Sequence, residues 1–565
     1  MNGFVLWSVL FACGGKETEY EGDDPGECSD QADNDRDGAF DCDDQDCAGS
    51  PECEEDCGGV DCGDDTGEEI DTGDTGDIQD TGSTESACVP GSGSIENASN
   101  WNASFIGDND LNPPPTFDLL GWSVATCDFD GDGFDDVIST GPYANGYLGK
   151  VIVNYGPGEA WTVDTPTSES FSDAQIKGLA ASEDTDITYD PTGLVGIRVR
   201  CGDIDGDGDD DLLIGRGEHT LSNDEVAILV FKNDGNRLNG FVDALEADIT
   251  LTFDAGVSEY SYWPTFWVAD IDPNPGEEIL FFMNNNQNYA LDFGNPNGVA
   301  PNADNKIWVL TTEGLVLGEQ DMEDALLYKI TPDGSDSVTS IRPIDEFGPS
   351  DGEVDLFIGQ GYLKNGSSVP GSASILNTLP NSNFDISDQE IIRIDGSGND
   401  WFGRDGIVGD FNGDGTVQTL IGAPGSNGGS GALHYYEGDG ENTPTLVQTW
   451  NGSNGSGTYG LGWTFDHIGD FNNDGTTDIF VSAYENGKAY IMDGNCLGEP
   501  NITIEESSLL TITSESSSLY FGREISTGDI DGDGMIDLVI GAPGHFTGSP
   551  SAPEGKVFLR LSSRE

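Results

Sequence analysis

The chain alternates short apolar runs with acidic, glycine-rich turns, and one paired pattern of this kind recurs along its length. In the clearest copy, residues 529–544, aspartates stand at positions 1, 3, 5 and 9 of a loop, and glycines at positions 4 and 6 permit tight curvature. The apolar run Leu538-Val539-Ile540 follows and ends at Gly541-Ala542-Pro543. This pattern predicts a tight acidic loop that leads into a short buried strand.

Copies of this loop recur at a nearly constant spacing of 59 to 75 residues. In chain order they begin at Asp128, Asp203, Asp270, Asp345, Asp410, Asp470 and Asp529. A glycine precedes most of these loops by seven or eight residues, at Gly121, Gly196, Gly403, Gly462 and Gly522. Seven units of this kind occupy residues 95–565. Short strand-rich units at a fixed period predict radial repetition of four-stranded sheets.

The repeat glycines follow phenylalanine in Phe402-Gly403 and Phe521-Gly522, and Gly-Ala-Pro follows the loop at 422–424 and 541–543. Together with the loops, these residues resemble the FG-GAP repeat of integrin alpha-subunit headpieces and their bacterial relatives. The resemblance covers roughly 470 of 565 residues. It implies an all-β protein, a seven-bladed β-propeller of four-stranded blades, with one calcium loop in each competent blade and no catalytic activity.

The loops are candidate calcium sites. Several carboxylates on one tight loop repel each other unless a cation lies among them, and calcium prefers six to eight oxygen ligands. Loops one, two, six and seven have a complete oxygen set, and the resemblance adds the backbone carbonyl at position 7. The predicted ligands of these four loops are Asp128, Asp130, Asp132, Phe134, Asp136, Asp203, Asp205, Asp207, Asp209, Asp211, Asp470, Asn472, Asp474, Thr476, Asp478, Asp529, Asp531, Asp533, Met535 and Asp537.

The other three loops depart from this pattern. Loop three offers Asp270, Asp272, Asn274 and Glu278 but contains prolines, so weaker binding is expected. Loop five offers Asp410, Asn412 and Asp414 but has Gln418 in place of a carboxylate. Loop four, which begins at Asp345, has an extra residue and Phe347 near position 3, and is expected to be empty. The chain is therefore expected to bind about four to six Ca²⁺ ions; the alternative is a set of acidic, solvated turns.

The charge of the chain excludes some classes of binding partner. With 106 acidic and 20 basic residues, the net charge is −86. This excludes a nucleic-acid partner, which requires a basic surface, and it argues against attraction to anionic membranes. Such self-repulsion destabilises a compact state, and divalent cations in the loops would relieve it.

The start of the chain predicts export. Residues 1–13 are interpreted as a signal peptide that ends in a lipobox, Leu10-Phe11-Ala12-Cys13, although no basic residue precedes Phe4. Lipidation of Cys13 would anchor the protein to a membrane by acyl chains alone, as an outer-membrane or cell-surface lipoprotein of a bacterium. The alternative is an ordinary secretory signal and a secreted protein.

Residues 14–94 are poor in apolar residues and rich in Asp, Glu, Gly and Thr, which predicts a disordered acidic stalk that contains cysteines. Six cysteines lie between Cys28 and Cys62. This segment is either a disulfide knot or, through the acidic stretch 33–44, a further metal motif. The sequence leaves both readings open.

Ring closure is the last structural expectation. Residues 556–561 align with the third strand of a unit, so the seventh blade needs a fourth strand, and residues 101–107 are the candidate. A disulfide between Cys88 and Cys496 would then fix this latch. Cys127 and Cys201 precede the loops of neighbouring blades and are either bridged or buried thiols.

Three functions remain compatible with the sequence. The first is a surface-displayed, monomeric binding or adhesion module for a protein partner, as the resemblance implies. The second is a carbohydrate-binding propeller, if certain tryptophans are exposed for stacking on sugar rings rather than packed between blades. These are Trp101, Trp161, Trp263, Trp401 and Trp463. The third, a hydrolase, lacks a recognisable site, so the chain is expected not to be an enzyme.

Overall fold

The computed structural model describes Cys88, Pro90 and most of residues 93–562. The gaps within this range are 108–117, 145–147, 158–160, 163–164, 167–171, 179–193, 218–224, 255–262, 273, 285–305, 333–335, 345–353, 364–369, 378, 399, 441, 453–459, 515–517 and 547–552. The predictions for the signal peptide, Cys13, the stalk, its six cysteines and loop four therefore lie outside the described residues. In the described part, no helix is long and apolar enough to cross a membrane.

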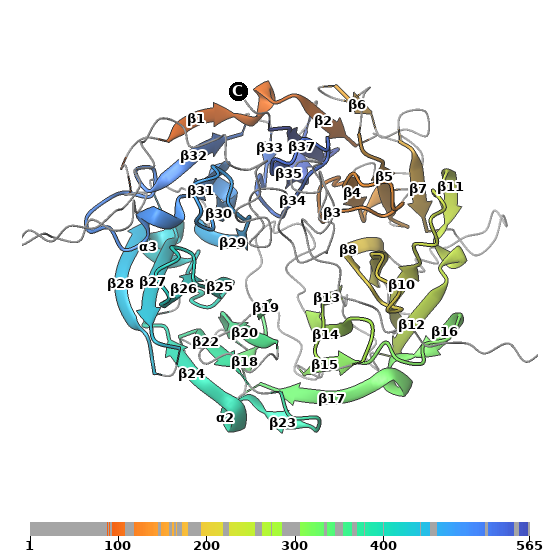
Figure 1. Cartoon of the computed structure of the whole chain (residues 1–565), viewed down its shortest axis with the longest axis horizontal. Helices are drawn as coiled ribbons and strands as arrows, with labels where there is room; N and C mark the ends of the chain where they lie inside the picture. Colours follow the sequence, from red (N-terminus) through yellow and green to blue (C-terminus); the bar gives the residue numbers. More distant parts are fainter. Residues whose placement is uncertain are drawn as a thin grey trace, which may run out of the picture. The chain divides into compact units, whose positions relative to one another are not determined.

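Seven sheets are arranged around a common axis, which confirms the predicted seven-bladed β-propeller (Figure 1). Blade one contains β3 (Val124–Cys127), β4 (Asp136–Gly141), β5 (Lys150–Asn154) and β7 (Ala174–Lys177). Blade two contains β8 (Leu194–Gly202), β9 (Asp211–Gly217), β10 (Glu225–Phe231) and β12 (Ile249–Asp254). Blade three contains β13 (Trp263–Ala269), β14 (Glu278–Asn284), β15 (Ile307–Leu310) and β17 (Leu326–Thr331).

The remaining blades follow the same antiparallel order from the axis outward. Blade four contains β19 (Ser340–Ile344), β20 (Asp355–Gln360), β22 (Ser372–Leu376) and β24 (Glu390–Asp395). Blade five contains β25 (Gly406–Gly409), β26 (Val417–Gly422), β27 (Ala432–Gly438) and β28 (Thr445–Asn451). Blade six contains β29 (Leu461–His467), β30 (Ile479–Ala483), β31 (Lys488–Met492) and β32 (Ser508–Thr513). Blade seven contains β34 (Ile525–Gly528), β35 (Asp537–Ala542), β37 (Lys556–Arg560) and β2 (Ala103–Ile106).

Short elements complete the described chain. Two pairs of two-residue strands are β18 (Asp336–Ser337) with β21 (Tyr362–Leu363), and β33 (Ser518–Leu519) with β36 (Gly544–His545). The helical turns are η3 (Ala98–Asn100), η4 (Ala244–Glu246), η5 (Met322–Ala325), α2 (Ile386–Gln389), α3 (Ser426–Gly429), η7 (Tyr484–Asn486) and η8 (Gly494–Cys496).

The hydrophobic core lies between the blades. In β9, Leu212, Leu213 and Ile214 are all fully buried. Leu212 and Ile214 pack with residues of blade one, whereas Leu213 packs with residues of blade three. Because alternate side chains of a strand point to opposite faces, a central strand of a blade must be apolar on both. This explains the continuous apolar runs that follow each acidic loop.

Most blades gain a short fifth strand, which the sequence did not predict. Each fifth strand comes from the segment that precedes the fourth strand of the next blade, and it pairs in parallel with the outer edge of the blade before it. These pairs are β11 (Gly240–Asp243) with β7, β16 (Gly318–Asp321) with β12, β23 (Phe384–Asp385) with β17, β1 (Ser94–Asn97) with β32 and β6 (Thr165–Pro166) with β2. Such pairing covers outer edges that would otherwise present unpaired backbone groups.

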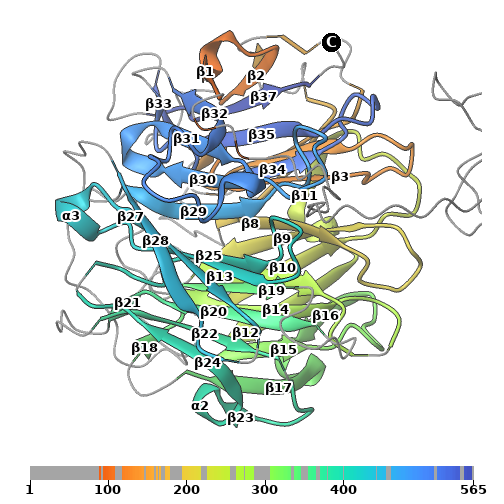
Figure 2. The same cartoon turned by 60° about the vertical axis from the view of Figure 1, so that its left-hand side comes forward.

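The ring closes as predicted. Strand β2 pairs antiparallel with β37, from Ala103 opposite Leu559 to Ile106 opposite Lys556. Figure 2 shows this orange strand beside the blue strands of the chain's end. A disulfide joins Cys88 to Cys496. The predicted latch between the two ends of the propeller is therefore confirmed.

A second disulfide joins Cys127 to Cys201. Cys127 ends β3 in blade one, and Cys201 lies near the end of β8 in blade two. Of the two alternatives that the sequence left open for this pair, the bridge is the one that the structure contains.

Candidate metal centres

Each acidic loop that the structure describes connects the innermost strand of its blade to the second strand, and backbone amides hold it in shape. In loop one, the N–H groups of Asp132 and Gly133 donate to Asp128 Oδ1 and Oδ2 at 2.9 and 2.8 Å. Gly131 and Gly133 adopt φ angles of 71° and 89°, a region that favours glycine. The two glycines of the motif are therefore required by the backbone turn.

The aspartate at position 9 anchors the loop to the blade. In loop one, Asp136 is fully buried and accepts N–H bonds from Phe129 at 3.0 Å and from Gly156 at 2.9 Å. The same arrangement recurs at Asp211, Asp478 and Asp537. Each of these carboxylates receives one bond from loop position 2 and one from elsewhere in the blade.

Burial raises the pKa values of these anchors. The pKa rises to about 8 for Asp136, to about 7 for Asp478 and to about 6 for both Asp211 and Asp537. Loss of water is the largest cause, and neighbouring loop carboxylates add to it. A cation among these groups would favour their ionised forms, so the electrostatics of the loops suit a bound metal.

Three loops bring carboxylates together closely enough to share an ion. Within the described residues, groups of three acidic side chains with ligand atoms less than 4.8 Å apart are Asp128, Asp130 and Asp136; Asp203, Asp205 and Asp207; and Asp529, Asp531 and Asp537. They belong to loops one, two and seven, each of which was predicted to have a complete oxygen set.

Loop seven fits a cation best. Asp529 Oδ1 and Asp531 Oδ1 are buried oxygens with no hydrogen-bond partner in the described structure. Burial, and next the charge of Asp533, raises the pKa of Asp531. Buried carboxylate oxygens are costly unless a hydrogen bond, an ion pair or a metal compensates them. The donor set is all oxygen, which is the set that calcium prefers.

In loops one and two, basic side chains of blade two contact the carboxylates. Arg237 forms ion pairs with Asp130 and Asp132, and Lys232 forms one with Asp205. The Arg237 side chain is 45% exposed, so it has room to move away from an arriving ion. The sequence pattern did not reveal either residue, because both lie outside the loop motif: Arg237 is 105 residues from Asp132, and Lys232 is 27 residues from Asp205.

Loops three and six are less convergent. In loop six, Asp474 accepts hydrogen bonds from Thr476, Asn472 and Asn495, and these bonds lower its pKa. In loop three, Glu278 accepts N–H bonds from Ile271 and Asp272 at 2.9 and 3.1 Å. Among the described residues, neither loop forms a cluster of three carboxylates like those of loops one, two and seven.

In loop five, Gln418 takes the place of the aspartate at position 9. Gln418 Oε1 accepts from Phe411 N at 2.6 Å, as the position-9 aspartates do elsewhere. Its Nε2 donates to Asn412 Oδ1 and to the carbonyl of Thr416, both at 3.0 Å. These are the oxygens at positions 3 and 7. The glutamine amide thus supplies hydrogen-bond donors to oxygens that would otherwise face an ion.

Comparison with known proteins finds similarity to one repeat family in two segments of the propeller. An FG-GAP repeat model matches residues 120–154, and an FG-GAP-like repeat model matches residues 470–540. Integrin alpha-PS5 of Drosophila melanogaster is 31% identical over 160 residues, which is 26% of this chain and 15% of that protein. Integrin alpha-PS3 of the same fly is 29% identical over 161 residues, 26% of this chain and 14% of that protein.

A third relative is the phosphatidylinositol-glycan-specific phospholipase D of Mus musculus. It is 30% identical over 113 residues, which is 19% of this chain and 13% of that protein. The matched segments thus span between 13% and 15% of the lengths of these three relatives.

Proposed function

We propose that this chain, an FG-GAP β-propeller similar to integrin alpha subunits, is a calcium-stabilised binding module that recognises a protein ligand outside the cell. The observation that carries the calcium part is the pair of buried, unpartnered oxygens on Asp529 and Asp531. Loops one, two and seven are the strongest ion sites, loops three and six are weaker, and loop five is held without an ion by Gln418. The proposal therefore assigns no ion to Asp410, Asn412 and Asp414, which the sequence pattern made candidate ligands.

The binding role rests on the similarity to integrin alpha chains over the repeat region. It is a proposal for this chain, because the similarity covers a small part of those proteins. Export, with anchoring through a lipidated Cys13 or release after an ordinary signal cleavage, belongs to the same proposal. The protein acts as a monomer whose propeller is joined to its anchor by the residues between Cys13 and Cys88.

The glycan alternative loses part of its support. Trp101 and Trp463 are only 5% and 3% exposed, so of the two alternatives that the sequence left open they are packed rather than exposed for stacking on sugar rings. Trp463 instead stacks on Tyr484 with ring centroids 4.6 Å apart. The side chain of Trp263 lies outside the described residues. A propeller interior favours this packing because large flat rings fill the space between blades.

An adhesion assay tests the proposed function. Beads coated with the full chain should attach to cells of the source organism in calcium and detach in EDTA, whereas beads coated with the Asp531→Ala variant should attach less. Treating the cells with protease should abolish attachment if the ligand is a protein, and periodate oxidation should abolish it if the ligand is a glycan. Absence of attachment in calcium would contradict the binding role, and attachment unaffected by EDTA would contradict its calcium dependence.

A further inference from the structure

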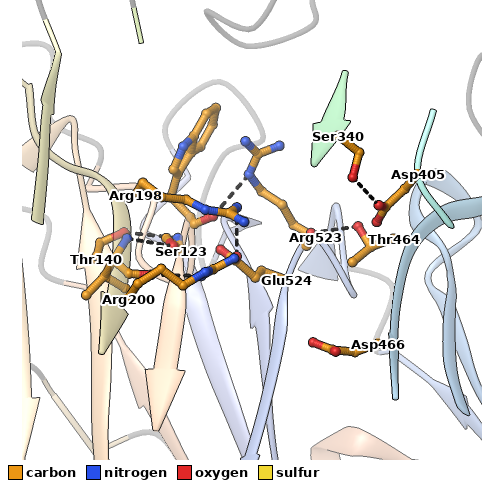
Figure 3. A network of polar contacts seen from close by, with 12 residues as sticks. Ser123, Thr140, Arg198, Arg200, Ser340, Asp405, Thr464, Asp466, Arg523 and Glu524 are labelled. Atoms are coloured by element: carbon orange, nitrogen blue, oxygen red, sulfur yellow. Dashed lines mark hydrogen bonds and ion pairs between the residues drawn. The ribbon is translucent and has the colours of Figure 1, made fainter. Parts of the chain in front are cut away.

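The propeller axis holds a cavity of about 120 Å³ to which all seven blades contribute. Blades one to three contribute Trp122, Arg198 and Thr265 among others, and the remaining blades contribute Arg342, Arg404, Thr464 and Arg523. These residues come from the innermost strands or from the residues just before them. Figure 3 shows part of this polar network. The cavity exists only because the ring is closed.

The lining of this cavity is basic although the chain as a whole is strongly acidic. Five arginines and three acidic residues line it, which leaves an excess of two positive charges among the lining side chains. The arginines are Arg198, Arg200, Arg342, Arg404 and Arg523, and the acidic residues are Asp405, Asp466 and Glu524. Since the chain has only 20 basic residues, a quarter of them lie around this one cavity.

Two of the three lining carboxylates, Asp405 and Glu524, already have close guanidinium partners. Asp405 accepts from Arg342 Nε at 3.0 Å, from Arg342 NH2 at 2.8 Å and from Ser340 Oγ at 2.6 Å. One oxygen, Glu524 Oε1, is shared by Arg198 at 2.8 Å and Arg200 at 2.7 Å. The third, Asp466, lies 3.7 Å from Arg342 NH1. The three carboxylates together offset only three of the five arginine charges.

Arg198 and Arg200 retain unused donors. Their Nε atoms are buried and have no hydrogen-bond partner in the described structure. Burial, and next repulsion from Arg200, lowers the pKa of Arg198 to about 9. A buried guanidinium N–H without an acceptor costs free energy that an anion in the cavity would recover.

Tryptophans hold the guanidinium groups in place. The Arg523 guanidinium lies 3.7 Å from the ring centroid of Trp122, and that of Arg200 lies 4.3 Å from the ring centroid of Trp267. Stacking restricts these side chains before any ligand arrives, which lowers the entropy that binding would cost. The donors are thus preorganised around the axis.

We propose that the axial cavity binds a small oxyanion, a carboxylate, phosphate or sulfate group, through the guanidinium groups of Arg198, Arg200 and Arg523. Guanidinium groups match the paired oxygens of such anions. A volume of about 120 Å³ accommodates one anion of this size with a few waters, since a water occupies about 30 Å³. This site is separate from the acidic loops and does not depend on the proposed function.

Titration of the full chain with sodium sulfate, phosphate and succinate tests the proposal, with melting temperature and calorimetry as readouts and sodium chloride at matched ionic strength as reference. Arg198→Gln and Arg523→Gln should each weaken binding by about ten- to a hundredfold, the usual cost of a lost charged hydrogen bond. Arg393→Gln is the matched control, because Arg393 pairs with Asp395 on an outer strand and its loss also removes one positive charge. This control should bind like the unmodified chain.

Several outcomes separate the alternatives. If sulfate or phosphate binds most tightly, the ligand of the cavity is assigned as a free inorganic anion. If succinate binds most tightly, the ligand is assigned as a molecule with a carboxylate group. If Arg198→Gln misfolds because Glu524 loses a partner, Arg523→Gln and the charge-preserving Arg523→Lys still report on the site, and both should bind more weakly. An equal response of all variants, or a response to chloride equal to that to the oxyanions, would overturn the proposal and leave the arginines as links between blades.

Discussion

The acidic loops and the basic axial cavity are clusters of like charge built in opposite ways. Loop seven gathers its carboxylates from nine consecutive residues, 529–537, and its shape is fixed by local backbone bonds. The axial cavity takes its arginines from four blades. Arg198 and Arg523 both line it although most of the chain lies between them in sequence. A local cluster needs only a turn, whereas a distributed cluster needs the whole ring.

A chain with a net charge of −86 distributes its charges unevenly. Carboxylates are concentrated in loops where metal ions can compensate them, and a quarter of the scarce basic residues lie at the axis, where Trp and a few carboxylates hold them. Each cluster therefore favours a ligand of the opposite charge.

Removing calcium should have the largest effect. An ion that binds only the folded state contributes about 2.7 kcal/mol at a concentration 100 times its dissociation constant. With three convergent loops, EDTA should lower the melting temperature of the full chain by roughly 5–10 °C relative to calcium. Differential scanning calorimetry measures this shift. Superimposable traces in the two buffers would show that no calcium ion stabilises the loops. The contrast between metal-binding loops and anion-binding cavity would then fail.

Removing the Cys88–Cys496 disulfide of the latch should affect the axial cavity but not the acidic loops. The Cys88→Ser/Cys496→Ser double variant loses a bridge that spans 408 residues and should lose about 5 kcal/mol of stability. Because the cavity needs a closed ring, sulfate binding should weaken in the folded variant, while calcium stoichiometry stays the same. Calorimetry and native mass spectrometry report the two quantities.

The Cys127→Ser/Cys201→Ser variant is the control for this test. It removes a bridge that spans only 74 residues and joins neighbouring blades, so its stability loss should be smaller. A larger loss in this control than in the latch variant would show that closure is not what the longer bridge stabilises.

Single-loop substitutions should distinguish convergent loops from loop five. Asp531→Ala should remove one calcium ion, seen by native mass spectrometry, and should cost up to about 2.7 kcal/mol in calcium. Asp414→Ala should remove none, because Gln418 already donates to the oxygens of that loop.

The converse substitution is Gln418→Asp. It restores the carboxylate at position 9 and removes the competing donor, so it should add one ion to the count. An unchanged count in this variant, or loss of an ion in Asp414→Ala, would contradict the assignment of loop five.

The pH dependence should show the smallest effect. In EDTA, the anchor carboxyls Asp136 and Asp478 have pKa values of about 8 and 7, above their ordinary value of 3.8. The folded state therefore binds protons more readily than the unfolded state between pH 4 and 8, and metal-free stability should rise as pH falls through that range. In calcium, protons compete with the ion, so the gap between melting temperatures in calcium and EDTA should narrow from pH 8 to pH 6. If the difference in melting temperature between calcium and EDTA stayed constant with pH, the anchor carboxyls would not be part of the metal sites.

Much of the fold could be predicted because its determinants are local and repeated. The Asp-x-Asp-x-Asp-Gly loops, the apolar runs after them and the preceding glycines defined seven blades. The last strand of the chain aligned with the third strand of a unit, which indicated that residues 101–107 supply the fourth strand of blade seven. Because the motif recurs along the chain, each copy supports the assignment of the others.

The site was predicted less completely. Sequence named the loop carboxylates, but it could not show that Asp529 and Asp531 keep buried oxygens without partners while the amide of Gln418 satisfies those of loop five. It also missed Arg237, which reaches loop one from blade two. These differences depend on which side chains of neighbouring strands reach a loop, and the repeat pattern does not encode that.

The blades, their order and the acidic loops follow from the sequence alone, because each depends on residues close together in the chain. The axial cavity follows only from the folded ring. Arg404 and Arg523 directly follow the repeat glycines Gly403 and Gly522, the same position that holds Trp122 in blade one. Along the chain these residues are isolated, since more than a hundred residues separate each from the next. Ring closure brings them to a common axis, because radial repetition places equivalent positions of all blades around one point.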